Sequence, residues 1–254
     1  MNLIRKNLIL PKVIVIAGPT ASGKTSLGIN LALKFNGEVI SADSRQVFKG
    51  LDIGSGKATK DESKGVPHHL IDILNPEDKY NVFQFQKDCI KLINYISQRG
   101  KIPIIVGGTG LYIESVVEQY EFSRFKKKSI KKKGLRPNTL VLILSPNRDQ
   151  IKHNIQKRLL QRWQKQNMIY EVESLIESGV SKKWLKSLGL EYKFLTNYLE
   201  ERFDSEDEML TKLNTESWHY AKRQITFFKR WDYSHNIQTK SEALNLVKDF
   251  LKKQ

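Results

Sequence analysis

The feature that most constrains this chain is the stretch GPTASGKT at residues 18–25, which matches the pattern G-x-x-x-x-G-K-[ST] in full. An apolar, β-branched run precedes it at residues 13–17, and a helical apolar pattern follows at Leu27, Leu31 and Phe35. Glycines at such a turn let backbone N–H groups point inward, and the following helix offers its positive end to an anion. The order of strand, loop and helix therefore predicts a binding site for a pyrophosphate or a polyphosphate.

Strand and helix patterns alternate through the first 145 residues. Residues 82–99 and 110–120 have helical spacing, and apolar runs typical of buried strands occur at 13–17, 38–41, 67–73, 102–106 and 140–144. This alternation predicts an α/β fold, namely a P-loop NTPase-like, doubly wound parallel sheet flanked by helices. Ligands of such sheets bind at the carboxyl ends of the strands, so we expect residues 18–25, 42–46 and 107–110 to converge on one site.

The remainder of the chain is predicted to be all helical. We divide the sequence into an α/β core, residues 1–145, and a helical C-terminal part, residues 146–254, that packs on the core. Ser145 and Pro146 suit the cap and the first turn of a helix. Beyond residue 168 each periodic segment has helical spacing: 168–179, 184–199, 205–231 and 239–252.

The chain is strongly basic, with 43 Lys and Arg against 27 Asp and Glu and a formal net charge of +16. This balance favours a polyanionic partner, most often nucleic acid, although the surface of a protein from a Lys-rich proteome would give the same count. The single cysteine, Cys89, excludes an internal disulfide framework. We see no secretory signal and no apolar run near the ~20 residues of a membrane span, and we expect a cytoplasmic protein without a membrane partner.

Three residues carry candidate chemistry. Asp43 directly follows the second strand, so its carboxylate could act as a general base or near a bound Mg²⁺, although a turn-forming aspartate would occupy the same position. Thr109 could hydrogen-bond a phosphate or a base, or it could cap the next helix. Arg223, on the long C-terminal helix, could direct its guanidinium at a pyrophosphate or lie on a solvated helix face.

Six motifs follow one another between residues 13 and 231. They are GPTASGKT at 18–25, ISADSRQV at 40–47, LDIG at 51–54, PHHLID at 67–72, VGGTGLY at 106–112 and YAKRQIT at 220–226. The first motif is common to many phosphate-binding proteins, whereas the SADS, PHH and AKRQ blocks are specific to one family. In this order the six motifs resemble those of tRNA dimethylallyltransferases, the isopentenyltransferases that modify the adenosine next to the anticodon.

The resemblance implies a particular reaction. In this family the phosphate loop holds the pyrophosphate of dimethylallyl diphosphate, with Mg²⁺, and the dimethylallyl group goes to the exocyclic amine of the adenosine 3′-adjacent to the anticodon. By motif position, Asp43 would take a proton from that amine. Lys24, Thr109 and Arg223 would neutralise the leaving pyrophosphate, and Thr25 would be the protein ligand of Mg²⁺.

The resemblance also implies two sets of binding residues. The diphosphate is expected at Gly18, Pro19, Thr20, Ala21, Ser22, Gly23, Lys24, Thr25 and Arg158. The adenosine must leave its stack to reach the site, and we expect it to contact Asp43, Ser44, Arg45 and Gln46. We further expect a monomer whose partners are tRNA and dimethylallyl diphosphate.

One segment departs from the family pattern. Typical members insert a helical domain of several dozen residues after the GGT helix, whereas this chain has only a basic loop at 121–138. No acidic residue occurs from Phe122 to Arg148, and we expect a mobile, RNA-facing segment, although a solvated linker would have a similar composition. We therefore assign tRNA binding to Lys126, Lys127, Lys128, Lys131, Lys132 and Lys133. A second departure is Asn154, where a basic residue is expected.

Three other functions stay open from the sequence. The missing insertion favours an adenylate isopentenyltransferase acting on free AMP, ADP or ATP, whereas the charge and the AKRQ block favour tRNA as substrate. A P-loop nucleotide or small-molecule kinase would use ATP as a phosphoryl donor. A non-catalytic RNA-binding protein would have been free to lose Lys24, Thr25 and Asp43, all of which are present.

Overall fold

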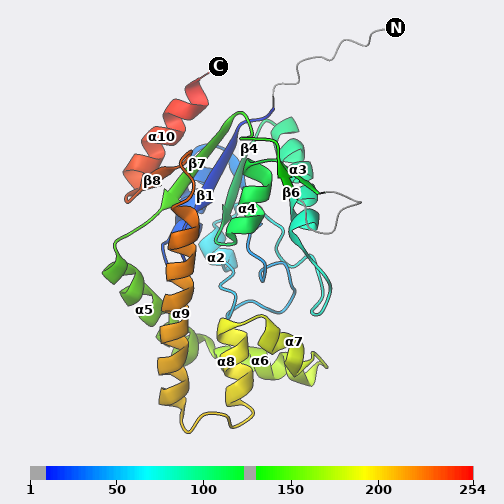
Figure 1. Ribbon diagram of the computed structural model, residues 1–254, viewed down its shortest axis with the longest axis vertical. Helices are drawn as coiled ribbons and strands as arrows, with labels where there is room; N and C mark the ends of the chain where they lie inside the picture. The colour runs from blue at the N-terminus through cyan, green and yellow to red at the C-terminus, as the bar shows by residue number, and fades with distance from the viewer. Residues whose placement is uncertain (1–9, 123–129, 254) are drawn as a thin grey trace.

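A computed structural model describes residues 10–122 and 130–253 of the chain. Its centre is a six-stranded sheet in the order β3-β2-β4-β1-β7-β8, with every neighbouring pair parallel (Figure 1). The strands are β1 Val13–Ala17, β2 Gly37–Ala42, β3 His68–His69, β4 Ile102–Gly107, β7 Thr139–Leu144 and β8 His235–Ile237. The predicted doubly wound parallel sheet is confirmed.

Helices cover both faces of the sheet because the central strands bury side chains on both sides. Val13 and Val15 of β1 pack with α3 (Val82–Gln98) and α4 (Gly110–Val117), together with the end of α9 (Glu206–Phe228). The alternate residues Ile14 and Ile16 pack with α1 (Lys24–Lys34) and α10 (Lys240–Lys252). Opposite directions of successive side chains thus join one strand to two separate cores.

A third core lies beyond the carboxyl ends of the strands. It combines Val47, Phe48 and Leu51 of the loop after β2 with the C-terminal helices. Figure 1 shows α9 running from these helices up along the sheet. The helices are α2 Lys60–Ser63 in the core and α5 Arg148–Gln166, α6 Met168–Glu177, α7 Lys182–Ser187 and α8 Leu190–Tyr198 in the C-terminal part.

The C-terminal part is not all helical, which corrects the sequence prediction. Residues 235–237 form β8, which pairs parallel with β7 and extends the sheet, and α10 then packs beside α1. A three-residue strand with one buried apolar side chain, Ile237, gives too short an alternation to detect in sequence. The division of the chain into domains at residue 145 stays a prediction.

Two helix predictions also need correction. The helix expected from Ser145 begins at Arg148, because Asn147 caps it by accepting the N–H of Gln150. The helix expected over 184–199 is interrupted at Gly189, whose φ of 74° lies in the left-handed region. Among the described helices none is long and apolar enough to cross a bilayer.

The basic segment is partly a hairpin. β5 (Tyr120–Phe122) pairs antiparallel with β6 (Ile130–Lys132), so Lys131 and Lys132 lie in a strand rather than in a loop. Lys132 contacts the carboxylates of Glu114 and Glu118, at 2.8 and 2.5 Å. Lys126, Lys127 and Lys128 lie outside the described residues.

The buried carboxylate of Glu38 connects β2 to β3 and to the residues that precede β4. Glu38 of β2 is 1% exposed and contacts Arg99, Lys101 and His69 at 2.6 to 2.8 Å. Burial alone would raise the pKa of Glu38, but hydrogen bonds from Lys101, His69 and Arg99 lower it to about 2. This ionised carboxylate therefore contributes free energy to folding at neutral pH.

Replacement of Glu38 by Gln should destabilise the protein by roughly 3 kcal/mol at pH 7, because three cationic or polar partners lose a buried counter-charge. The pKa of Glu38 is lower in the folded state, so its contribution is complete above pH 4.5 and is lost as the pH falls toward 2. The difference in free energy of unfolding between wild type and Glu38→Gln, measured with urea, should therefore decrease as the pH falls from 4.5 toward 2. The exposed Glu208→Gln variant, which loses only an i,i+4 pair with Lys212, is the control. Equal stability of wild type and Glu38→Gln at pH 7 would contradict this account.

Candidate active site

The carboxyl ends of β2 and β4 meet in a tight joint. Gly107, the last residue of β4, lies opposite Ala42, and a Cβ atom at position 107 would stand 2.1 Å from the Ala42 carbonyl oxygen. The same oxygen accepts the Thr109 N–H at 3.2 Å, and Thr109 Oγ1 accepts the Ser44 N–H at 3.1 Å. Glycine is required at this close approach. The joint brings Thr109, which does not cap α4 with its side chain, next to the segment that carries Asp43.

The phosphate loop follows β1 and ends at Gly23, directly before α1 begins at Lys24. Gly23 has a φ of 90°, which lies in the left-handed region. Lys24 Nζ donates to the Pro19 carbonyl oxygen at 3.1 Å, so the side chain folds back over the loop. A Cβ atom at Gly18 would stand 2.5 Å from the Leu144 carbonyl oxygen, and φ of Gly18 is 155°. The predicted strand, loop and helix are therefore present with the glycines where the backbone needs them.

Residues far away in the sequence support the outer side of the loop. Gln224 of α9 accepts the Thr20 N–H at 2.7 Å and donates to the Gly108 carbonyl oxygen at 2.9 Å. Arg158 Nη2 donates to Thr20 Oγ1 at 2.5 Å, and Asn154 donates to the Ala21 carbonyl oxygen at 3.0 Å. Thus Arg158 lies at the loop as predicted, and Asn154 supplies an amide contact where a basic residue was expected.

Two cations at the loop, Lys24 and Arg158, are buried and form no ion pair with a carboxylate of the described residues. Burial, followed by the neighbouring Arg158, lowers the pKa of Lys24 to about 8, against the opposing effect of Asp43. Burial and then Arg162 lower the pKa of Arg158 to about 10. In addition, Ser22 Oγ is buried and has no hydrogen-bond partner among the described residues. Desolvated cations beside an unsatisfied hydroxyl fit an anion of high charge, such as a diphosphate.

Asp43 forms the turn that was one of its two possible roles from the sequence, and its role as a general base stays a prediction. Its Oδ1 accepts the N–H groups of Arg45 at 2.9 Å and Gln46 at 3.4 Å, so the residue forms an Asx turn. Oδ2 accepts no hydrogen bond from the described residues. The carboxylate lies within electrostatic range of Lys24 and Tyr112: it partly offsets the lowered pKa of Lys24 and, after burial, raises the pKa of Tyr112. One oxygen fixes the turn while the other can receive a proton.

The three residues after Asp43 point in different directions. The Ser44 side chain is exposed. Arg45 Nε donates to the Leu188 carbonyl oxygen at 2.9 Å, and its guanidinium lies 5.8 Å from the Tyr220 ring centroid. Gln46 accepts the Ser41 hydroxyl at 2.8 Å and donates to the Gly56 carbonyl oxygen at 3.2 Å. Gln46 is thus oriented by the protein itself.

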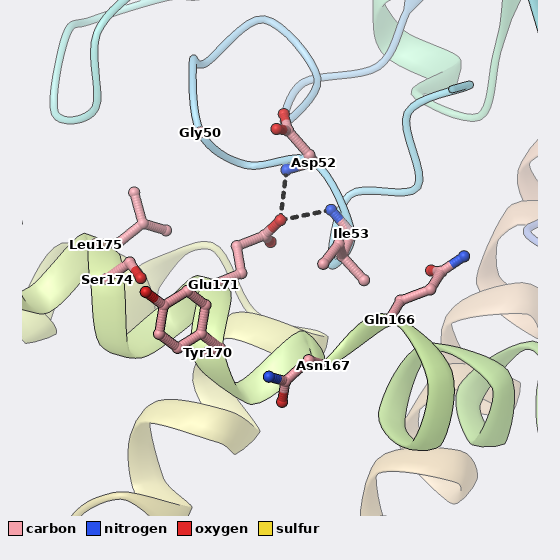
Figure 2. Close-up of a pocket in the computed structure, with 9 residues that line it drawn as sticks. All are labelled: Gly50, Asp52, Ile53, Gln166, Asn167, Tyr170, Glu171, Ser174 and Leu175. Atoms are coloured by element: carbon pink, nitrogen blue, oxygen red, sulfur yellow. Dashed lines mark hydrogen bonds between the residues drawn. The ribbon is translucent and has the colours of Figure 1, made fainter. Parts of the chain in front are cut away.

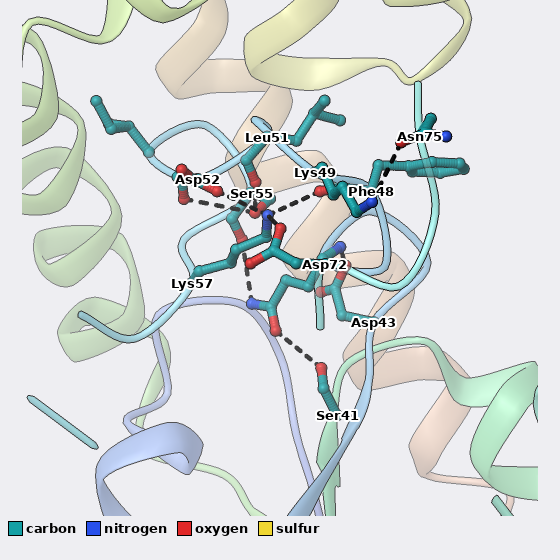
Figure 3. Close-up of polar contacts among 12 residues, drawn as sticks. Ser41, Asp43, Phe48, Lys49, Leu51, Asp52, Ser55, Lys57, Asp72 and Asn75 are labelled. Carbon is teal, nitrogen blue, oxygen red and sulfur yellow. Dashed lines mark hydrogen bonds and ion pairs between the residues drawn. The ribbon is translucent and has the colours of Figure 1, made fainter. Parts of the chain in front are cut away.

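Lys57 fixes the loop that follows. Its side chain is 7% exposed, and Nζ donates to the Phe48 carbonyl oxygen at 2.7 Å and to the carboxylates of Asp52 and Asp72 at 2.7 and 2.5 Å. Figure 3 shows these contacts next to the Ser41 side chain and Asp43. The ammonium has three donors and three acceptors, so its hydrogen bonds are satisfied. The loop is therefore held in one shape beside Gln46.

Glu171 also fixes this loop, through hydrogen bonds from backbone N–H groups. Glu171 of α6 accepts the N–H groups of Asp52 and Ile53 at 2.9 and 2.6 Å, in an open recess of about 310 Å³ (Figure 2). Its other oxygen accepts the Gly54 N–H at 3.1 Å and the Tyr192 hydroxyl at 2.9 Å. All these groups satisfy one another, so Glu171 supports the loop rather than binding a ligand.

The structure does not bring every predicted residue to the loop. Arg223 is exposed on α9, with its guanidinium 5.8 Å from the Tyr220 ring centroid, and no described contact joins it to the phosphate loop. Lys131, Lys132 and Lys133 lie on the hairpin strand and just after it, where Lys132 is paired and Lys133 contacts Glu121 at 2.6 Å. The roles of Arg223 and these lysines stay predictions.

Several residues at the site were not singled out in the sequence. Gln224 belongs to the AKRQ block, so its position was indicated although its contacts were not. Arg162, which is buried and lies 3.4 Å from both Glu191 and the Gly54 carbonyl oxygen, had no distinguishing signal on its basic helix. Glu171 likewise resembled any acidic residue of an amphipathic helix.

Mg²⁺ is the one metal that the predictions require. The described residues contain no group of three His, Cys, Asp or Glu side chains that could hold a metal ion. Mg²⁺ takes few protein ligands and keeps water and substrate phosphate oxygens in its shell, so a single hydroxyl such as that of Thr25 fits its preferences when a diphosphate is present.

Comparison with known proteins places this site in a family. The family model described as IPP transferase matches residues 46–136 and 120–231. The chain is 38% identical to tRNA dimethylallyltransferase 2 of Shewanella sediminis over 270 positions, covering 86% of this chain and 89% of the relative. Those 270 positions exceed the 254 residues of this chain, so the relative contains segments that are missing here.

Solved structures agree. A tRNA isopentenylpyrophosphate transferase from Bacillus halodurans superposes with a TM-score of 0.86 at 29% identity, covering 95% of this chain and 97% of the other. A tRNA delta(2)-isopentenylpyrophosphate transferase from Staphylococcus epidermidis superposes with a TM-score of 0.82 at 30% identity, covering 96% and 100% of the two chains. The family model, the relatives and the solved structures agree with the order of motifs in the sequence, and the chain belongs to the IPP transferase family.

Proposed function

We propose that this protein is a tRNA dimethylallyltransferase. It transfers a dimethylallyl group from dimethylallyl diphosphate to the exocyclic amine of the adenosine 3′-adjacent to the anticodon, and it releases pyrophosphate. The observation that carries this proposal is that one carboxylate, Asp43, lies at the carboxyl edge of the sheet within electrostatic range of two desolvated cations, Lys24 and Arg158. The relatives reported above are tRNA enzymes, which favours tRNA over free adenylate and prenyl transfer over a kinase reaction.

The reaction exchanges one bond for another. The adenine amine nitrogen attacks the allylic carbon, the carbon–oxygen bond to the diphosphate breaks, and the electron pair leaves with the diphosphate. Asp43 Oδ2 accepts the proton that the amine loses, since Oδ1 is held by the Arg45 and Gln46 N–H groups.

The leaving group gains charge as the bond breaks, and fixed donors stabilise it. Lys24, Arg158 and the backbone of the loop surround the predicted diphosphate position. Thr109, two residues after β4, is assigned to the same diphosphate by motif, and its hydroxyl accepts the Ser44 N–H. Arg223 is assigned to the same diphosphate by motif, from an exposed position on α9. Thr25 would hold Mg²⁺, which would supply further neutralisation of the leaving group's charge. Exclusion of water protects the allylic group from hydrolysis.

The partners follow from this reaction. The substrates are tRNA, presented by its anticodon loop, and dimethylallyl diphosphate, and we place the enzyme in the cytoplasm as a monomer. The adenosine is turned out of its stack toward Asp43, Ser44 and the oriented Gln46, because a stacked amine is inaccessible.

Asp43→Asn should abolish most prenyl transfer and leave the fold intact, because the amide oxygen can still accept the Arg45 and Gln46 N–H groups but cannot take a proton. The expected loss of kcat is about 10²- to 10⁴-fold. Purified protein is incubated with dimethylallyl diphosphate, Mg²⁺ and either bulk tRNA or AMP, and digested nucleosides are analysed by mass spectrometry. Asp149→Asn, whose side chain is 95% exposed, is the matched control. Prenylated product from AMP alone would contradict the proposed substrate.

Binding of inorganic pyrophosphate should weaken above pH 8. In the free protein Lys24 loses its proton near pH 8, whereas the anion favours the charged ammonium, so binding above this pH requires proton uptake. The affinity should fall by up to about tenfold per pH unit relative to Lys24→Arg, whose guanidinium stays protonated. Calorimetry in two buffers with different ionisation enthalpies measures the uptake. Titration of the pyrophosphate itself is common to both proteins, so parallel pH profiles would show that Lys24 does not contact the anion.

Alanine at Lys126, Lys127, Lys128, Lys131, Lys132 and Lys133 should weaken tRNA binding and flatten its dependence on salt. Each lost phosphate contact lowers the slope of log K against log[salt] by about 0.7 to 0.9. Lys132 alone should contribute least, because Glu114 and Glu118 already neutralise it. A triple variant at Lys248, Lys252 and Lys253 of the C-terminal segment is the control. An unchanged slope in the six-lysine variant would assign this segment to a linker.

A further inference from the structure

An open recess of about 460 Å³ lies directly beside the proposed catalytic carboxylate. It is lined by four separate parts of the chain: the turn after Asp43, the segment before α3, α4 and α7. The lining includes Ser44, Phe48, Lys79, Tyr80, Tyr112 and Trp184. None of its lining residues comes from the phosphate loop, α5 or α9, which hold the predicted diphosphate position.

Aromatic rings form its walls. Phe48 and Trp184 meet edge to face with centroids 5.1 Å apart, and Tyr80 and Tyr112 do so at 6.2 Å. Phe48 and Tyr112 are 6% and 7% exposed, so they are fixed by the core, whereas Trp184 is half-buried. The recess therefore offers flat apolar surfaces at a wet boundary.

Polar groups surround these rings. Lys79, Asp78 and Asn81 are exposed at the rim. The Tyr112 hydroxyl makes no hydrogen bond with any described residue, and burial, followed by Asp43, raises the pKa of Tyr112 to about 12. The hydroxyl thus remains a donor at any physiological pH. A cation, an amide and a phenol around aromatic rings match a nucleotide, which has a phosphate, polar base edges and a flat face.

The recess is rigid before any ligand arrives. Ser181 caps α7 by accepting the Trp184 N–H at 3.4 Å, and the Ser181 N–H donates to Glu77 at 2.8 Å. At the other end of α7, the Leu188 carbonyl oxygen accepts Arg45 Nε. These contacts attach the wall that carries Trp184 to both neighbouring loops.

We propose that this recess binds the base of a nucleotide next to the target adenosine, stacked against Trp184. The inference rests on the proposed function. An adenosine turned out of the anticodon loop leaves its neighbours without a stacking partner, and an aromatic recess that adjoins Ser44 replaces that partner. The dimethylallyl group is the competing occupant. Its five carbons cannot form hydrogen bonds with the polar rim, and the diphosphate to which it is attached is predicted to bind at the phosphate loop.

The test is a double-mutant cycle between protein and RNA. Anticodon stem-loop RNAs carry an abasic nucleotide on the 5′ or the 3′ side of the target adenosine, and binding to wild type and Trp184→Ala is measured. We expect Trp184→Ala to weaken binding of the intact RNA by about 5- to 150-fold. One of the two abasic RNAs should bind wild type more weakly by a similar factor. Trp184→Ala and that abasic RNA together should lose no more affinity than either change alone. The inference would be overturned if the losses of binding free energy from Trp184→Ala and from each abasic position were additive. It would also be overturned if the wild-type protein did not bind the stem-loop.

Three comparisons separate stacking from a merely structural effect. Trp184→Phe should keep the affinity of wild type while losing the quenching of tryptophan fluorescence by RNA. Tyr170→Ala, at an aromatic side chain 61% exposed outside this recess, should change neither. In steady-state assays Trp184→Ala should raise the KM for tRNA and leave the KM for dimethylallyl diphosphate unchanged. A selective rise in the latter would assign the recess to the prenyl tail. Stem-loop binding with the expected coupling but without prenylated product would reject the proposed function and keep the stacking site.

Discussion

The close approach of β2 and β4 at Gly107 and Ala42 is the contact on which the rest of the site depends. A side chain at position 107 would separate these strands. Thr109 would then lose its bond to the Ala42 carbonyl oxygen, and Ser44 would lose the Thr109 hydroxyl. The phosphate loop is joined to the same edge through Gln224, which contacts both Thr20 and Gly108. The phosphate loop and the Asp43 carboxylate are therefore positioned by one set of contacts, in which the side chains of Thr109 and Gln224 bind backbone groups.

The charges around this edge are arranged at a cost that the substrate offsets. Burial lowers the pKa of both Lys24 and Arg158, helped by Arg158 in the first case and by Arg162 in the second, and a bound anion would favour their protonated forms. On the other side, Gln46 and the loop from Asp52 to Gly56 are fixed by Lys57 and Glu171, whose polar groups are satisfied within the protein. The two cations are therefore desolvated, whereas the polar groups that fix Gln46 and its loop are paired within the protein.

The sequence predicted those parts of the site that follow directly from strands. Residues 18–25, Asp43 and Thr109 each come after a buried apolar run, and the carboxyl ends of parallel strands share one edge, so their convergence could be expected. Contacts between distant segments were not predictable in this way. Glu171 meets Asp52 across 119 positions, and Gln224 meets Thr20 across 204. The same reason hides β8, whose three residues become a strand only because β7 offers an unpaired edge.

That late strand bears on how the protein is made. During synthesis the phosphate loop emerges early, but its supporting contact from Gln224 and the outer strand β8 are supplied by residues more than two hundred positions later. A nascent chain has its glycine turn and its helix, yet lacks the residue that fixes the loop to Gly108. Domains that form from such distant contacts close late. A ribosome that stops before residue 224 would therefore release a chain that cannot hold its diphosphate site in place, rather than a slow enzyme.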